Sequence, residues 1–256
     1  MYDSLEKFVA DAAEELGDRL VCVYEFGSRA GEEHPRISDR DLLVCVRSRH
    51  DIPEVARALT RLEHRTFGHH HSKSALFSER YLLGTNDLVG LHMIIIGADE
   101  LAHGSIKSFR LKILTALVIS PGIFFYELKS NARLLYGQDL LHMIKVPMVG
   151  FADRIKSFAV ATIVLALTPL AAGNVQHFKV WCFKAAKYYA GCIQSYTQIV
   201  RHDDTIRFED LGYDTTAYHL AQTYRYHPGE YKKSLIGLYV ISWISLIRNL
   251  SFLWRG

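Results

Sequence analysis

The chain has 256 residues, of which 49% are hydrophobic and 22% charged, and its formal net charge is +3. The large apolar fraction excludes wholesale disorder, and six prolines and seventeen glycines are too few for a fibrous or low-complexity protein. Mild basicity tolerates an anionic ligand but does not by itself indicate a nucleic-acid-binding protein.

The first part of the chain alternates helix and strand patterns. Apolar residues at helical spacing predict a helix over 3–16, with Gly17 as its stop. Another helix is predicted over 51–65, where a proline stands in the first turn. β-rich runs predict four strands: 20–26, 41–46, 91–96 and 133–136.

Strand patterns fade after residue 147, and the remainder reads as helical. The predicted helices are 151–167, 175–200, 215–226 and 231–253. At roughly 150 residues per domain, this length accommodates two small domains. We therefore expect an α+β domain over 1–147, with a mixed sheet flanked by helices, and an all-α helical bundle over 148–256.

The cysteine pattern and the apolar segments indicate the compartment. The four cysteines are far apart and form no CxxC pair, which favours buried thiols in a reducing cytoplasm. The first residues are acidic and lack the apolar stretch of a signal peptide. Apolar stretches at 158–172 and 235–247 fall short of the ~18 residues that a spanning helix needs. We expect a cytoplasmic protein with no membrane partner.

The first predicted strand ends in a pair of small residues, Gly27 and Ser28. Glycine allows the backbone to approach a ligand closely, and amide groups at such a turn favour phosphate oxygens. The hydroxyl group of Ser28 adds a further donor. The turn is therefore a candidate phosphate site, although an ordinary turn explains each residue taken alone.

Two acids, Asp39 and Asp41, stand two residues apart where the second strand begins. The two-residue period of a strand places both carboxylates on one face. Paired carboxylates repel each other unless a cation lies between them, and hard oxygen ligands suit Mg²⁺ together with substrate phosphates. A phosphate-binding turn beside such a carboxylate pair is typical of phosphoryl or nucleotidyl transfer.

These residues resemble the polymerase-β-type nucleotidyltransferase superfamily. The resemblance rests on Phe26-Gly27-Ser28-Arg29-Ala30 followed by Ser38-Asp39-Arg40-Asp41-Leu42-Leu43-Val44, and it covers about residues 18–97. The segment Arg133-Leu134-Leu135-Tyr136-Gly137-Gln138-Asp139-Leu140 also resembles one that often follows the catalytic core of these proteins.

The resemblance implies a specific site. Gly27, Ser28 and Arg29 would bind the phosphates of a nucleoside triphosphate, with ATP favoured. Asp39 and Asp41 would bind two Mg²⁺ ions, for which Mn²⁺ could substitute. An acceptor hydroxyl would attack the α-phosphate, and pyrophosphate would leave.

The sequence departs from the family pattern at two places. The family usually has a third carboxylate on a later strand, where this chain has His92. His92 could replace it as general base, Asp87 or Glu79 could supply the acid, or the protein could work with two carboxylates or bind without catalysis. The second departure is Arg40 between the two acids, which could offset their charge or be solvated.

The longest predicted helix carries a basic and aromatic face. Lys184, Lys187 and Tyr188 share this face by their spacing. Helical domains of related enzymes often close over the nucleotide, which makes Lys184 and Tyr188 candidate nucleotide-binding residues. A solvated basic face is the alternative.

The sequence therefore leaves two alternative functions open. The first is a Mg²⁺-dependent nucleotidyltransferase that moves a nucleoside monophosphate to the hydroxyl group of a small molecule, a protein or an RNA end. The second is a catalytically degenerate member that binds a nucleotide or a partner, as an antitoxin-like module does. A third carboxylate near Asp39 and Asp41 would favour the enzyme.

Overall fold

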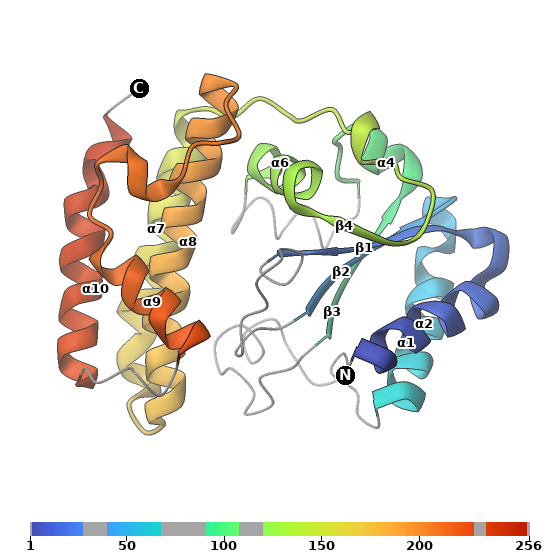
Figure 1. Ribbon diagram of the computed structural model, residues 1–256, viewed down its shortest axis with the longest axis horizontal. Coiled ribbons are helices and arrows are strands. Elements are labelled where there is room, and N and C mark those ends of the chain that lie inside the picture. Colours follow the sequence, from blue (N-terminus) through green and yellow to red (C-terminus); the bar gives the residue numbers. More distant parts are fainter. Residues whose placement is uncertain (1, 28–39, 68–90, 108–119, 228–233, 255–256) are drawn as a thin grey trace.

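The computed structural model describes residues 2–27, 40–67, 91–107, 120–227 and 234–254. Its first part is built on a four-stranded mixed sheet (Figure 1). In spatial order the strands are β3 (Leu91–Gly97), β2 (Arg40–Val46), β1 (Leu20–Phe26) and β4 (Arg133–Gly137). β1 runs antiparallel to both β2 and β4, whereas β2 and β3 are parallel. All four predicted strands and the mixed sheet are confirmed.

Helices cover both faces of this sheet. On one face, Val23, Leu42 and Val44 pack against α1 (Tyr2–Leu16) and α2 (Ile52–Phe67). On the other, Tyr24, Leu43 and Cys45 pack with residues of α4 (Ala98–Ala102) and α6 (Pro121–Asn131). Alternate strand residues therefore enter two different cores, as the two-residue period requires.

The predicted helical pattern near the N-terminus is confirmed by burial. The side chains of Leu5, Phe8, Val9, Ala12 and Leu16 are all buried along one face of α1. By contrast, α6 was not predicted. Its residues Ile123, Phe124, Phe125 and Leu128 are buried around much of the helix, so they leave no one-sided apolar stripe in the sequence.

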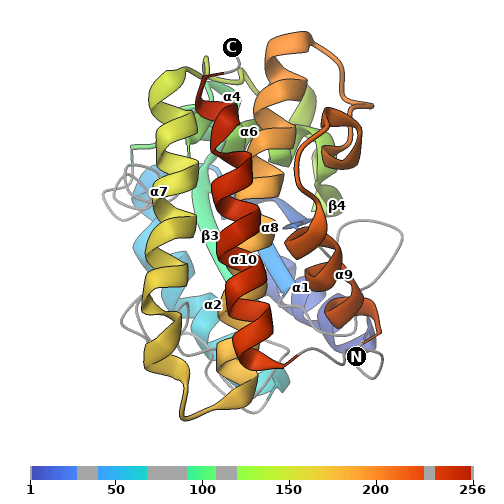
Figure 2. The same ribbon diagram turned by 90° about the vertical axis from the view of Figure 1, so that its left-hand side faces the viewer.

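The second part of the chain is an all-helical bundle (Figures 1 and 2). It consists mainly of α7 (Phe151–Leu167), α8 (Val175–Arg201), α9 (Thr216–Tyr226) and α10 (Leu235–Asn249). The long helix α8 packs against each of the other three. The predicted fold class, an α+β part followed by a helical bundle, is confirmed, and the part of the last predicted helix at 231–233 lies outside the described residues.

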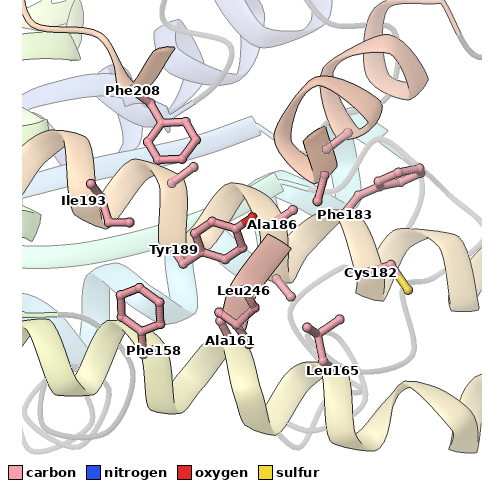
Figure 3. Packing of buried hydrophobic residues seen from close by; sticks show 14 of the residues in the cluster. Phe158, Ala161, Leu165, Cys182, Phe183, Ala186, Tyr189, Ile193, Phe208 and Leu246 are labelled. Atoms are coloured by element: carbon pink, nitrogen blue, oxygen red, sulfur yellow. The ribbon is translucent and has the colours of Figure 1, made fainter. Parts of the chain in front are cut away.

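The bundle has an aromatic core (Figure 3). Tyr189 of α8 lies between Phe158 and Phe208, with ring centroids 6.2 and 6.4 Å apart. Its hydroxyl group donates a hydrogen bond of 3.0 Å to Ser245 Oγ on α10. The buried residues of this core all follow residue 147, and those of the two sheet cores precede it. The division at 147–148 stays a prediction.

Two helical segments are long and apolar enough to cross a membrane, Phe151–Ala171 and Leu235–Leu253. The prediction that these stretches are too short is therefore wrong, because each helix with its following turn extends beyond the apolar run. One third of each apolar window is buried within the bundle. The four cysteines are buried thiols, as expected, and the cytoplasmic location stays a prediction.

Candidate functional site

The candidate site begins where β1 ends and β2 starts. Phe26 pairs with Asp41 at the last position of the β1–β2 ladder, so Gly27 follows directly beside that acid. Gly27 has φ +72°, and a Cβ atom placed there would lie 2.6 Å from Asp41 Oδ2. The positive φ strains any residue other than glycine, and a Cβ atom would displace the Asp41 carboxylate. The structure thus brings together two of the predicted site residues.

Other predicted residues of this motif cannot be located. Ser28, Arg29 and Asp39 lie outside the described residues, as do Asp87 and Glu79. The predicted metal pair is therefore represented by Asp41 alone. Within the described ranges, no group of three or more His, Cys, Asp or Glu side chains could hold a metal ion.

His92 is placed by its backbone. It is the register partner of Asp41 on the parallel strand β3. β2 and β3 both begin at the end of the sheet where β1 finishes. His92 therefore lies at the same end of the sheet as Gly27 and Asp41. The position expected for a third acid is thus next to Asp41 in the ladder, and a histidine occupies it. Its role stays a prediction.

Helix α8 brings a lysine into electrostatic reach of this edge. Burial lowers the pKa of Lys187 to about 7, and the neighbouring cations Arg225 and Lys184 act in the same direction. The carboxylates of Asp41 and Glu127 oppose that shift. The pKa of Lys187 is therefore affected both by Asp41 of the sheet and by Arg225 of α9. An anion bound among these cations would restore its charge.

The predicted residues of α8 lie beside this lysine. Lys184, one turn earlier, is partly exposed and contributes to the electrostatic environment of Lys187. Tyr188 is partly exposed and packs against the core of the bundle. Sequence spacing grouped all three but did not single out Lys187, because only the tertiary fold shows which of them is affected by Asp41.

Glu127 is a carboxylate that sequence reasoning missed. It lies on α6, and its Oε2 accepts a hydrogen bond of 2.7 Å from Asn131 Nδ2, while Ser195 Oγ of α8 donates to Oε1. The carboxylate thus links α6 to α8 and also acts on Lys187. No signal in the sequence identified it, since its helix was not predicted.

Arg40 has a structural role on the reverse face of β2. Its side chain is 6% exposed, and its Nη1 lies 3.4 Å from Oε1 of the buried Glu25. Arg133 of β4 donates to the other oxygen of Glu25 at 2.6 Å. The alternative that Arg40 is solvated is therefore wrong. This ion pair joins the first residue of β2 to β1, next to Asp41.

Comparison with solved structures shows the fold. The chain is similar to spectinomycin adenyltransferase AAD(9) from Enterococcus faecialis with ATP and spectinomycin, with a TM-score of 0.53 and 16% sequence identity. The match covers 97% of this chain and 98% of that one. The chain therefore shares the overall fold of this adenyltransferase, which agrees with the fold that its sequence motifs predict.

A second similar structure is a toxin–antitoxin with AMP-PNP, with a TM-score of 0.28 and 11% identity. It covers 67% of this chain and 95% of that one, and a likeness this weak carries no argument. No protein-family model matches the chain. A search of curated proteins also gives no match.

Proposed function

We propose that this protein is a Mg²⁺-dependent nucleotidyltransferase that transfers a nucleoside monophosphate, with ATP as the favoured donor. The observation that carries the proposal is the close approach of Gly27 to Asp41 at the start of β2, together with the effect of the Asp41 carboxylate on the pKa of Lys187 in the helical bundle. An anionic phosphate chain needs both a carboxylate-bound cation and nearby fixed positive charge. The nucleotidyltransferase fold supports the same conclusion.

The residues present are compatible with a metal. Asp41 supplies a hard carboxylate oxygen, and Asp39 would supply the second of the pair that Mg²⁺ requires beside substrate phosphates. Mn²⁺ prefers the same donors. A cation held there would neutralise charge on the phosphate oxygens during transfer.

The protein's own groups would bind and orient the donor. The missing side chain at Gly27 would permit close approach of the phosphates, and Ser28 and Arg29, which follow it in the sequence, would be donors. Lys187, Lys184 and Tyr188 would approach from α8. Protonated Lys187 would stabilise the negative charge that grows on the leaving pyrophosphate.

The reaction joins the acceptor oxygen to the α-phosphorus. As that bond forms, the bond from the α-phosphorus to the bridging oxygen of pyrophosphate breaks. The acceptor hydroxyl loses its proton to a general base, for which His92 stands at the expected register position. Glu127 is a second candidate base, because its carboxylate acts on the same lysine as Asp41.

A small hydroxylated molecule is the favoured acceptor. The similar adenyltransferase was solved with ATP and the small molecule spectinomycin, and its fold matches nearly the whole of this chain. A protein side chain and an RNA end are the other acceptor classes. The net charge of +3 does not distinguish among these classes.

The test is transfer of label from α-labelled ATP to a panel of small-molecule, protein and RNA acceptors. Wild-type protein with Mg²⁺ should label one acceptor class, and Asp41→Asn should lower the rate at least about 100-fold. Asp99→Asn is the matched control, because Asp99 is exposed and follows the opposite end of β3. Equal labelling by Asp41→Asn and wild type would reject the assignment.

The second candidate is a degenerate module that binds nucleotide without transferring it. The observation that favours it is His92 at the register position of the third acid. In that case ATP would bind in a manner sensitive to Asp41→Asn, but no acceptor in the panel would be labelled. Binding and transfer measured on the same sample therefore separate the two candidates.

A further inference from the structure

The outer side of the helical bundle carries an exposed apolar surface. In α10, Ile236, Val240, Ile244 and Ile247 recur at helical spacing and are 44–78% exposed. On the neighbouring α7 and its following turn, the exposed apolar residues include Ile155, Ile163 and Leu170. The two helices lie side by side, and in Figure 2 no described element covers them. We name these seven residues the α7–α10 face.

From this surface we infer that the protein forms a homodimer in which the α7–α10 faces of two copies pack together. Large exposed apolar patches on soluble domains mark interaction sites. The spacing of four, four and three residues along α10 is that of a helix seam packed against other helices. On α7 the smaller side chains Ala159, Thr162 and Ala166 are also exposed, which leaves room for the larger side chains of a facing helix.

The charge distribution favours a second copy. A twofold dimer places each residue of the face near the same face of its partner, so a charged surface would repel itself. No Asp, Glu, Lys or Arg occurs between Ser157 and Asn174, or between Ser234 and Ile247. The face therefore meets its own copy without like-charge contacts.

The placement of Arg248 and Arg154 disfavours helices that lie flat on a membrane surface. Helices that lie on membranes carry Lys and Arg along the polar flank of the apolar face. The basic residue at the end of α10, Arg248, is paired with Asp214 at 2.9 Å. Arg154 of α7 lies over the ring of Tyr196, 4.5 Å from its centroid, and so faces the bundle.

The size of the surface is close to that of a weak dimer interface. Helices of 17 and 15 residues are about 25 and 22 Å long at 1.5 Å per residue. With a width of about 10 Å each, they present on the order of 500 Å² per copy. Two copies would bury about 1,000 Å², near the lower limit for a specific interface. We therefore expect micromolar rather than nanomolar association.

The experiment is sedimentation velocity of the full chain over a concentration series from about 1 to 100 μM, the range for an interface of this size. The sedimentation coefficient of wild-type protein should shift from that of a monomer toward that of a dimer as the concentration rises. Ile244→Glu, which puts a charge in the middle of the face, should weaken dimerisation at least tenfold. Leu134→Glu is the matched control, because Leu134 is exposed to a similar extent but lies on β4.

A second variant guards against loss of folding. Ile236→Glu changes a side chain that is 78% exposed, so it should keep the far-UV circular dichroism of wild type and still weaken the dimer. A wild-type chain that stays monomeric would overturn the proposal, as would equal effects of Ile244→Glu and Leu134→Glu. Cosedimentation of a monomeric wild type with phosphatidylcholine vesicles would assign the face to lipid instead.

Discussion

At the scale of single residues, the close approach of Gly27 to Asp41 is the centre of the proposed site. A side chain at Gly27 would meet the Asp41 carboxylate, and φ +72° strains any residue other than glycine. The proposed function and the backbone geometry thus both favour glycine at this position. A substitution that separates the two effects shows whether Asp41 must stay where it is.

Gly27→Ala should lower nucleotide transfer far more than Gly17→Ala. Both glycines have positive φ, so each alanine should cost about 1–2 kcal/mol of stability from backbone strain. Only at Gly27 does the new methyl group meet Asp41, since nothing lies within 4 Å of a Cβ at Gly17. Urea unfolding and the labelled-ATP assay measure the two effects. Equal activity in the two variants would contradict the role of this contact.

Lys187 gives the site a characteristic pH dependence. Its folded pKa of about 7 lies below that of an unfolded lysine, so the unfolded chain binds more protons between about pH 7 and 10. Below pH 7 the buried lysine is charged in the folded state, which lowers the free energy of unfolding. This destabilisation decreases as the pH rises toward 10. Lys187→Met removes this destabilisation.

The variant should therefore be more stable than wild type at pH 6.5, and the difference should shrink as pH rises to 9.5. Thermal melts of both proteins in matched buffers measure that difference, which cancels the titration of other groups. A stability difference that stays constant with pH would show that Lys187 keeps an ordinary pKa. Lys179→Met, on the same helix, serves as the control.

At the scale of elements, the start of β2 positions the acid. Arg40 and Asp41 are adjacent and point to opposite faces of the sheet. The buried pair of Arg40 with Glu25 fixes one face, and Asp41 is presented on the other. Because buried charges are costly when left without a partner, this arrangement strongly constrains the strand.

Arg40→Met should destabilise the protein by about 3 kcal/mol, because Glu25 would lose one of its two arginines inside the sheet. Arg133→Met should cost less, since the side chain of Arg133 is 45% exposed and water can replace part of its contact. Urea titrations of the two variants give the comparison. An equal or smaller loss for Arg40→Met would show that the buried pair does not hold β2.

The elements also show what could be predicted from the sequence. The strands and α1 depend on local patterns, and the sequence predicts them; the site role of Gly27 and Asp41 stays a prediction. Helix α6 is buried around much of its surface and has no one-sided stripe, so both it and Glu127 were missed. The burial of Arg40 depends on Glu25 and Arg133, which lie 15 and 93 positions away in the chain. Such partners have no signature in a single sequence.

At the scale of the whole molecule, the sheet and the bundle contribute opposite charges to one place. Asp41 comes from the sheet, whereas Lys184, Lys187 and Arg225 come from α8 and α9. Sequence spacing placed the lysines on one helix face but could not tell which of them approaches the acid, because that depends on how the two parts pack. We therefore expect Asp41 and Lys187 to act on the same bound nucleotide.

Calorimetric titration with ATP, with and without Mg²⁺, tests this claim most directly because it needs no acceptor. Wild-type protein should bind ATP more tightly with Mg²⁺, Asp41→Asn should lose that gain, and Lys187→Met should weaken binding about 10- to 100-fold. The double variant should lose less than the sum of the two losses, since both groups act on one phosphate chain. An ATP affinity that changes neither with Mg²⁺ nor with the two substitutions would show that Asp41 and Lys187 do not bind the nucleotide.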